Sequence, residues 1–141
     1  MTRRLFASST LATSPRRNPT EDVRSRSILA ARAASAKNGA DTLVLEVGPI
    51  IGITDMFVIT SGRNVRQVKT IAEEIEKKLK DEGHPGPVRT EGLQDASWVL
   101  LDYGDFVVHV FLEETRDFYN LDRLWADAPR LEWEEHASAV S

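Results

Sequence analysis

Residues 98–112, WVLLDYGDFVVHVFL, decide the fold of this 141-residue chain. Both ends of this stretch are rich in β-branched and aromatic residues, which favour extended backbone. Between them lies Tyr103-Gly104-Asp105, and the glycine of such a short connection supplies the positive φ of a tight turn. The stretch therefore predicts an antiparallel hairpin of strands 98–102 and 106–112.

Three further strands are predicted N-terminal to this hairpin, at residues 42–47, 55–60 and 88–91. The run at 55–60, DMFVIT, is apolar almost throughout, as expected of a central strand that is covered on both faces. Gly48-Pro49 ends the first of these strands, and a short apolar loop leads to the second.

The helix with the clearest signals is predicted to begin after Asn64 and to stop at Gly83. Asn64 is suited to cap its N-terminus, and Gln67 completes a variant capping box. Glu73 and Lys77 have the spacing of an i,i+4 ion pair on the solvent side. The apolar stripe that faces the core consists of Val65, Val68, Ile71, Ile75 and Leu79.

Two more helices complete the prediction. The first begins at Thr20 or Ser25 and stops at Asn38-Gly39, and the last covers 113–119 and continues through 121–125 in one interpretation. The first helix shows a stripe of mostly small apolar residues, which indicates close packing against a sheet: Ile28, Leu29, Arg32, Ala33 and Ala36.

The predicted order α-β-β-α-β-β-β-α is typical of a single α/β domain with a mixed five-stranded sheet packed by helices. We expect a disordered N-terminal extension at 1–24, a folded domain at 25–128 and a flexible acidic tail at 129–141.

The charge of the chain is unevenly distributed. Residues 1–26 contain six arginines and two acidic residues, so the rest of the chain carries 12 basic and 20 acidic residues, a net charge of −8. An acidic body is poorly suited to phosphate backbone and suits a basic protein partner better. Cysteine is absent, and no apolar run approaches the roughly 20 residues that cross a bilayer. We therefore expect a cytoplasmic protein without a membrane partner.

Residues 1–20 are rich in Arg, Ser and Thr and contain no acidic residue. A disordered extension is the simplest interpretation, because the segment is too polar to bury an apolar face. A transit peptide has the same composition and would make the location organellar. The third alternative is an arm that contacts RNA, although we expect direct RNA contact to be minor.

No catalytic, cofactor or metal site is predicted, so we expect a protein that is not an enzyme. His109 is predicted to share a strand face with Val107 and Phe111, but it has no second histidine or cysteine at the spacing of a zinc site. Asp102 and Asp105 lie on either side of a turn. Their carboxylates are therefore not expected to share a strand face and converge on a metal ion. The Ser61-Gly62 turn is a weak anion-binding signal, which leaves a nucleotide-binding or nucleotidyltransferase-like enzyme, using Ser61 and Asp55, as the alternative.

Aromatic residues gather around the hairpin and the last helix, and they favour a binding surface over a reactive one. Trp98 and Tyr103 lie at strand and turn edges, where tryptophan and tyrosine often anchor protein interfaces. Filling of the core is the competing explanation for each of these aromatic residues.

The same residues, taken in order from about 25 to 125, resemble the ribosomal silencing factor (iojap-related) family. The blocks that carry the resemblance are residues 41–47 (DTLVLEV), 53–62 (ITDMFVITSG), 91–92 (EG), 98–111 (WVLLDYGDFVVHVF) and 114–125 (ETRDFYNLDRLW).

This resemblance implies a nucleotidyltransferase-like fold without the catalytic carboxylates. It also implies a function: binding of large-subunit ribosomal protein fourteen, so that the small subunit cannot dock and translation is repressed. Homodimers are a second assembly known in the family. Carried over to this chain, the partner-binding residues are Trp98, Asp102, Tyr103, Gly104, Asp105, His109 and Phe111. The family often has a shorter aliphatic residue in place of Tyr103.

Overall fold

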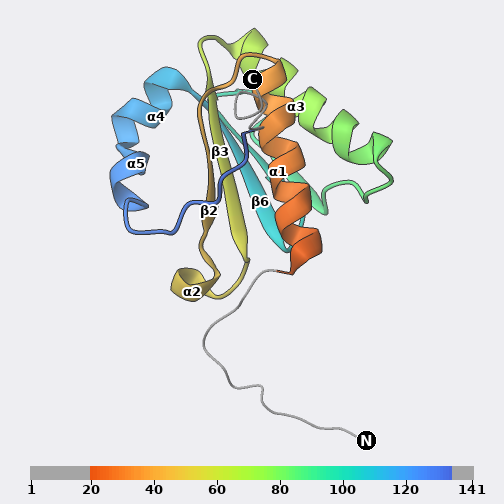
Figure 1. The fold of residues 1–141 in the computed structure, drawn as a ribbon. Coiled ribbons are helices and arrows are strands. Elements are labelled where there is room, and N and C mark those ends of the chain that lie inside the picture. Colours follow the sequence, from red (N-terminus) through yellow and green to blue (C-terminus); the bar gives the residue numbers. More distant parts are fainter. Residues whose placement is uncertain (1–19, 135–141) are drawn as a thin grey trace, which may run out of the picture.

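A computed structural model of the chain describes residues 20–134, which form two helices packed on one face of a five-stranded sheet (Figure 1). The sheet order is β2-β3-β6-β5-β4. The strands are β2 (Ala40–Glu46), β3 (Met56–Gly62), β4 (Arg89–Glu91), β5 (Trp98–Asp102) and β6 (Phe106–Leu112). β3 and β6 are parallel and the other neighbours are antiparallel, so the predicted mixed five-stranded sheet is confirmed.

The hairpin of β5 and β6 forms as predicted. Trp98 pairs with Phe111, Leu100 with His109 and Asp102 with Val107. The Tyr103 amide donates to the Phe106 carbonyl at 2.9 Å, and Gly104 has a φ of 88°, the conformation that the turn required.

Helix α3 (Val65–Asp81) begins at the predicted cap. The Asn64 Oδ1 accepts from the Gln67 amide at 2.8 Å, and the Gln67 side chain accepts from the Arg63 amide at 2.7 Å. Val65 is 40% exposed, so the buried stripe starts one turn later than predicted. Lys77 pairs with Asp81 at 3.0 Å instead of with Glu73.

Helix α1 (Glu21–Ala36) buries a different stripe from the predicted one. Thr20 caps it, and Arg32 and Ala36, which we expected to face the sheet, are exposed. Because four alanines bring the helix backbone close to its neighbours, the larger Ile28 and Leu29 are displaced to the rim. The buried residues are Val23, Arg26, Ser27, Ala30, Ala31, Ala33 and Ala34.

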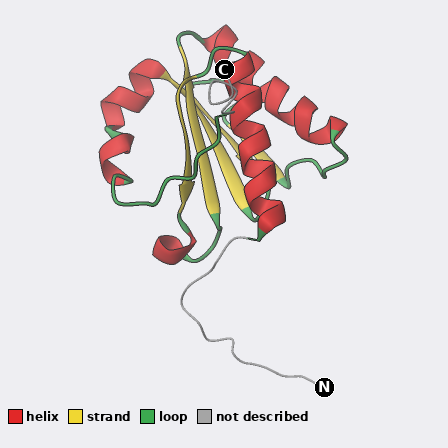
Figure 2. Cartoon of the chain, in the orientation of Figure 1, coloured by secondary structure: helices red, strands yellow, loops and turns green. Residues whose placement is uncertain are grey.

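The remaining helices are short (Figure 2). The expected loop after β2 contains one helical turn, α2 (Gly48–Ile51), which ends at Gly52 with a φ of 76°. α4 (Glu113–Tyr119) and α5 (Leu121–Leu124) are separate helices, because Asn120 adopts a φ of 52° between them. They lie on the side of the sheet away from α1 and α3 (Figure 1).

The predicted domain boundaries are corrected at both ends. Residues 21–24 form the first turn of α1 rather than part of a disordered extension. Residues 129–133, expected in a flexible tail, lie along the outer edge of β2: the Glu46 amide donates to the Pro129 carbonyl and the Leu131 amide to the Val44 carbonyl, both at 2.8 Å. Residues 1–19 and 135–141 lie outside the described part, and so do the transit-peptide and RNA-arm alternatives for the N-terminus.

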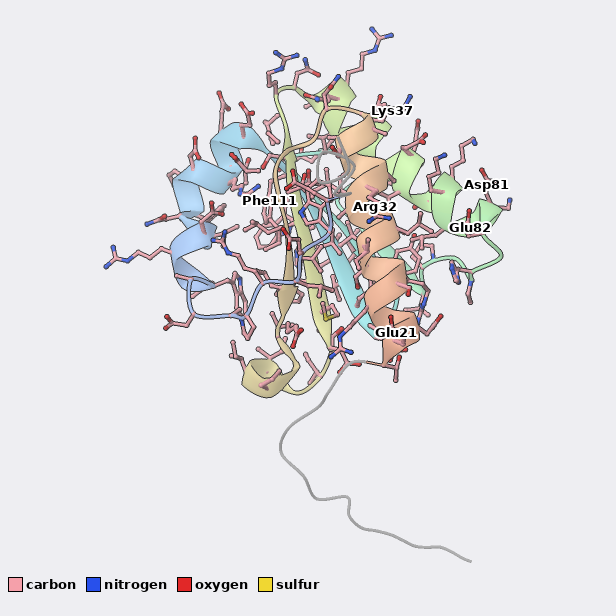
Figure 3. The ribbon with its side chains drawn as sticks, in the orientation of Figure 1. Glu21, Arg32, Lys37, Asp81, Glu82 and Phe111 are labelled. Carbon is pink, nitrogen blue, oxygen red and sulfur yellow. The ribbon has the colours of Figure 1, made fainter. Side chains whose placement is uncertain are left out.

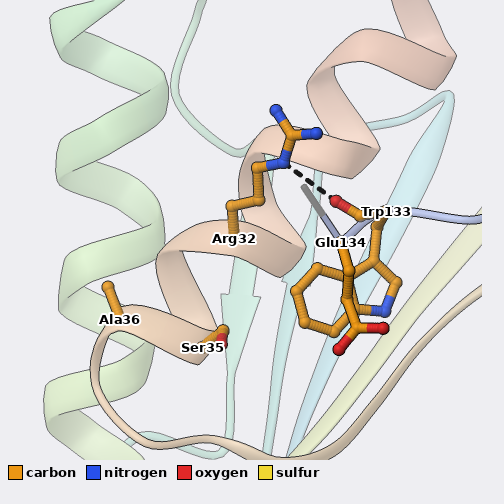
Figure 4. Close-up of a pocket in the computed structure, with 5 residues that line it drawn as sticks. All are labelled: Arg32, Ser35, Ala36, Trp133 and Glu134. Atoms are coloured by element: carbon orange, nitrogen blue, oxygen red, sulfur yellow. Dashed lines mark hydrogen bonds between the residues drawn. The ribbon is translucent and has the colours of Figure 1, made fainter. Parts of the chain in front are cut away.

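The C-terminal segment is also attached to α1. The Trp133 indole donates to the Thr42 carbonyl at 3.0 Å, and Arg32 Nε donates to the Trp133 carbonyl at 2.8 Å (Figure 4). A depression of about 450 Å³ lies between Trp133 and α1 and is also lined by Ser35, Ala36 and Glu134. Arg32 Nε and the polar groups of Trp133 are therefore engaged in holding the segment at the rim of this depression.

Two apolar clusters fill the two sides of the sheet. The larger one joins α1, α3 and the inner strand face, and it includes Val58, Ile71, Leu101 and Phe106. The smaller one lies under α4, α5 and the segment after them, and its members are Leu45, Val47, Ile59, Phe111 and Ala128. Figure 3 shows Phe111 on this second side, while Glu21, Asp81 and Glu82 project outward from the ends of α1 and α3.

Candidate functional site

The sheet face opposite α1 and α3 is only partly covered. α4 and α5 cover β3 and one end of β6, whereas Trp98, Leu100 and Asp102 of β5 remain at least partly exposed on this face. We define the open sheet face by five residues of β5 and β6: Trp98, Leu100, Asp102, Val107 and His109. Leu100, Asp102, Val107 and His109 of this face line a depression of about 400 Å³, whose lining also includes Ile53 and Phe57.

Trp98 is held in a fixed position on this face. Its indole Nε1 donates to the His109 Nδ1 at 3.1 Å, and its ring lies 4.8 Å from the Phe111 ring, centroid to centroid. The Trp98 side chain nevertheless remains 39% exposed. One part of the indole is therefore anchored in the protein while another part is presented to solvent.

The His109 imidazole is the buried partner that anchors Trp98. Burial lowers its pKa to about 4, so the ring is neutral at neutral pH. A neutral imidazole has one acceptor nitrogen, and Nδ1 accepts from Trp98, so the proton is on Nε2. Nε2 has no hydrogen-bond partner among the described residues, and the Phe57 ring packs edge-on against the imidazole at 4.5 Å.

The two carboxylates of the hairpin turn have different partners. Asp102 Oδ1 accepts from the Gly104 amide at 2.8 Å, and its other oxygen lies 3.3 Å from Arg89 Nη2. Asp105 lies 3.6 Å from Arg26, which connects the turn to α1. Asp102 has the turn-forming role that the sequence favoured for it, whereas the Asp105 carboxylate faces Arg26.

The seven predicted partner-binding residues do not form one surface. Trp98, His109 and Phe111 are in contact, but Phe111 is 2% exposed and lies beneath the indole. Tyr103 is on the other side of the sheet, where it stacks on Phe106 at 4.7 Å and is 8% exposed. The cause is strand alternation, which continues through the turn and directs Tyr103 towards α1 and α3.

The residues of the alternative nucleotide site do not converge. Asp55 precedes β3 and Ser61 is near its other end, so roughly 20 Å of extended chain separates them. Ser61 is buried, and its hydroxyl accepts from Arg116 Nη1 at 2.7 Å, so the space beside the Ser61-Gly62 turn is filled by a guanidinium group.

Two kinds of feature are absent from residues 20–134. No cluster of three or more His, Cys, Asp or Glu side chains is arranged to hold a metal ion. Among the helices in that range, none is long and apolar enough to span a membrane.

Sequence reasoning missed one residue that shapes this region. Arg116 is 5% exposed, and its Nε donates to Asp122 at 2.9 Å in addition to the bond to Ser61. The guanidinium therefore joins α4 to β3 and α5. The position of Arg116 as the one cation in an otherwise acidic helix was a signal for a structural role. The sequence could not identify its partner Ser61, which lies 55 positions away.

These features define a class: a small α/β domain with an open sheet face that displays one anchored tryptophan. A family model described as "Ribosomal silencing factor during starvation" matches residues 20–141. The chain belongs to this ribosomal silencing factor family, as the sequence blocks predicted.

Known relatives agree with this assignment. "Ribosomal silencing factor RsfS" of Bacillus subtilis is 44% identical over 101 residues, which are 72% of this chain and 85% of that protein. "Protein Iojap, chloroplastic" of Arabidopsis thaliana is 33% identical over 102 residues, or 72% of this chain and 42% of that longer protein. A crystal structure of a Chromobacterium violaceum protein superposes with a TM-score of 0.69 at 32% identity, covering 84% of this chain and 98% of the other.

Proposed function

We propose that this chain binds the large ribosomal subunit through ribosomal protein fourteen and thereby prevents the small subunit from docking, which represses translation. The observation that carries the proposal is the open sheet face with its anchored indole. Family membership supports it, because relatives are named ribosomal silencing factors.

The partner-binding residues in this proposal are the exposed Trp98 together with the residues that position it or form the adjacent turn. Trp98 supplies the aromatic anchor, and His109 and Phe111 position it from below. Asp102, Gly104 and Asp105 form the adjacent turn, and Tyr103 supports that turn from the core side. The acidic body suits a basic ribosomal protein, because complementary potentials increase the rate of encounter.

Steric exclusion requires no chemistry from the bound protein. An interface of roughly 1,600 Å² is the standard size for a specific complex, and a domain of this size bound there excludes a second body from the same surface. Competition requires a Kd below the free concentration of the factor, and a Kd of about 1 μM corresponds to about −8 kcal/mol.

Cosedimentation of the full chain with purified large subunits tests this proposal. Trp98→Ala is expected to weaken binding at least tenfold, because a few central aromatic residues usually dominate such interfaces. The indole is partly exposed, so the substitution should cost only about 1–2 kcal/mol of stability, and circular dichroism should stay native. Val65→Ala is a matched control, since Val65 is 40% exposed but lies on α3. Unchanged binding by Trp98→Ala would exclude Trp98 from the interface.

We further infer that the activity is binding rather than catalysis. The buried Ser61 and the distant Asp55 support this inference. Calorimetry with ATP, GTP and CTP in the presence of magnesium should give no heat of binding. Heat that disappears in Ser61→Ala or Asp55→Asn would instead establish a nucleotide site.

The proposal extends to the cellular location, the assembly state and the extent of the folded domain. We propose a cytoplasmic protein with a folded domain that extends beyond 25–128 at both ends, and homodimers as a second assembly. Analytical ultracentrifugation of the full chain measures the assembly state. Deletion of residues 1–19 should leave the salt dependence of ribosome binding unchanged if RNA contact by this segment is minor.

A further inference from the structure

A second aromatic surface lies beside the open sheet face, where β5 meets α4. We call it the α4 cleft, a depression of about 380 Å³ lined by Ser97, Trp98, Glu114, Thr115, Phe118 and Tyr119. Phe118 is 80% exposed and Tyr119 is 56% exposed. Their ring centroids are 5.0 Å apart, and Tyr119 is 6.1 Å from Trp98, so the three rings form one contiguous array.

The aromatic rings of the α4 cleft lie next to a negatively charged helix. The helix contains three carboxylates and one cation, Arg116, and the cation is turned inward to Ser61 and Asp122. Glu114 is exposed and forms no ion pair within residues 20–134. The outer surface of α4 therefore presents negative charge next to aromatic rings without a cation of its own to balance it.

We propose that the α4 cleft binds an arginine side chain on the basic surface of the protein partner. This inference rests on the proposed function for the identity of that partner. A guanidinium group is planar and weakly hydrated, so it can stack on aromatic rings while its N–H groups donate to a carboxylate. Phe118 and Tyr119 supply the rings, and Glu114 supplies the carboxylate. Lysine fits less well, because its compact ammonium group cannot stack.

Full-chain cosedimentation with purified large subunits, repeated over a range of salt concentrations, tests the cleft. Glu114→Gln and Phe118→Ala are each expected to weaken binding about tenfold, and Glu114→Gln should also reduce the salt dependence. Both side chains are exposed, so circular dichroism should remain native. The matched controls are Glu113→Gln, the same charge change on α4 outside the cleft, and Val65→Ala, an apolar side chain that is 40% exposed on α3. We expect binding by both controls to stay within about twofold of wild type.

A direct probe is N-acetyl-arginine amide, titrated into the ¹⁵N-labelled full chain while the Trp98 indole resonance is monitored. The resonance should shift with this probe, shift less with N-acetyl-lysine amide and remain still with the neutral N-acetyl-citrulline amide. A shift that persists in Phe118→Ala would overturn the assignment of the cleft.

The outcomes separate this inference from the proposed function. If the wild-type chain binds large subunits and both cleft variants bind equally well, the arginine site is wrong and the proposed function stands. If the wild-type chain does not bind, both fail together. If Phe118→Ala abolishes self-association in the ultracentrifuge but not ribosome binding, the cleft is an interface between copies and the partner assignment is wrong.

Discussion

The burial of His109 should make the stability of this protein fall as the pH is lowered below neutrality. The imidazole is 8% exposed, and burial lowers its pKa from 6.5 to about 4. His109 therefore becomes protonated near pH 6.5 in the unfolded chain but only near pH 4 in the folded protein. The free energy of unfolding is highest above pH 6.5, falls as the pH drops through the window between these values, and levels off below about pH 4.

The size of the effect follows from the shift. Each pKa unit corresponds to about 1.4 kcal/mol, so His109 should lower the free energy of unfolding by about 2 kcal/mol at about pH 5 and by about 3 kcal/mol below about pH 4. Urea unfolding at about pH 7 and about pH 5 measures the change, because most surface carboxylates stay ionised over this range.

Two variants isolate the contribution of His109 to the pH dependence of the free energy of unfolding. His109→Asn retains an acceptor close to the position of Nδ1 for the Trp98 indole but cannot titrate, and His109→Leu removes both properties. Both should lose most of the pH dependence, while only the leucine variant should free the indole and reduce ribosome binding. His84→Gln is the control and should keep the wild-type slope. A full slope retained in His109→Asn would refute the reasoning.

Three further predictions concern residues that hold the fold around the site. Arg116→Met should lower the free energy of unfolding, measured by urea denaturation, by about 2 kcal/mol, because the buried Ser61 hydroxyl loses its hydrogen-bond donor. Arg116→Lys should recover less than half of this loss, since lysine lacks the planar guanidinium group that reaches several acceptors at once. Trp133→Ala should lower the melting temperature by several degrees, at a cost of about 2 kcal/mol, by releasing the C-terminal segment from β2. Gly92→Ala should cost about 2 kcal/mol or more and broaden the Trp98 amide resonance, because Gly92 has a φ of 85° and an added Cβ would collide with the Trp98 carbonyl oxygen. Native stability of this variant would contradict the close approach of Gly92 to the Trp98 backbone.

Local signals were sufficient for most of the fold. The hairpin was predictable because its turn residues and its flanking apolar runs specify the same structure. The cap of α3 was predictable for a similar reason, since Asn64 and Gln67 act within one helical turn. The stripe of α1 was not, because alanines give little contrast in hydropathy between the buried and exposed sides of a helix.

The parts that the sequence did not reveal depend on distant partners. Arg116 is buried because Ser61, 55 positions earlier in the chain, accepts its hydrogen bond. Residues 129–133 are ordered because the edge of β2 supplies the hydrogen-bonding groups that this polar segment needs. Tyr103 was expected at the surface because it lies in a turn, and only the continued alternation of β5 shows that it faces the core.

The segment at residues 129–133 has a consequence for how the protein is made. β2 is synthesised early and the residues that shield its outer edge are synthesised after every other strand, so the nascent chain exposes open backbone groups while the rest of the domain forms. Such an edge is a template for unwanted strand pairing between neighbouring copies. A fragment cut at Trp125, where the last of the quoted sequence blocks ends, would keep that edge exposed permanently and should aggregate.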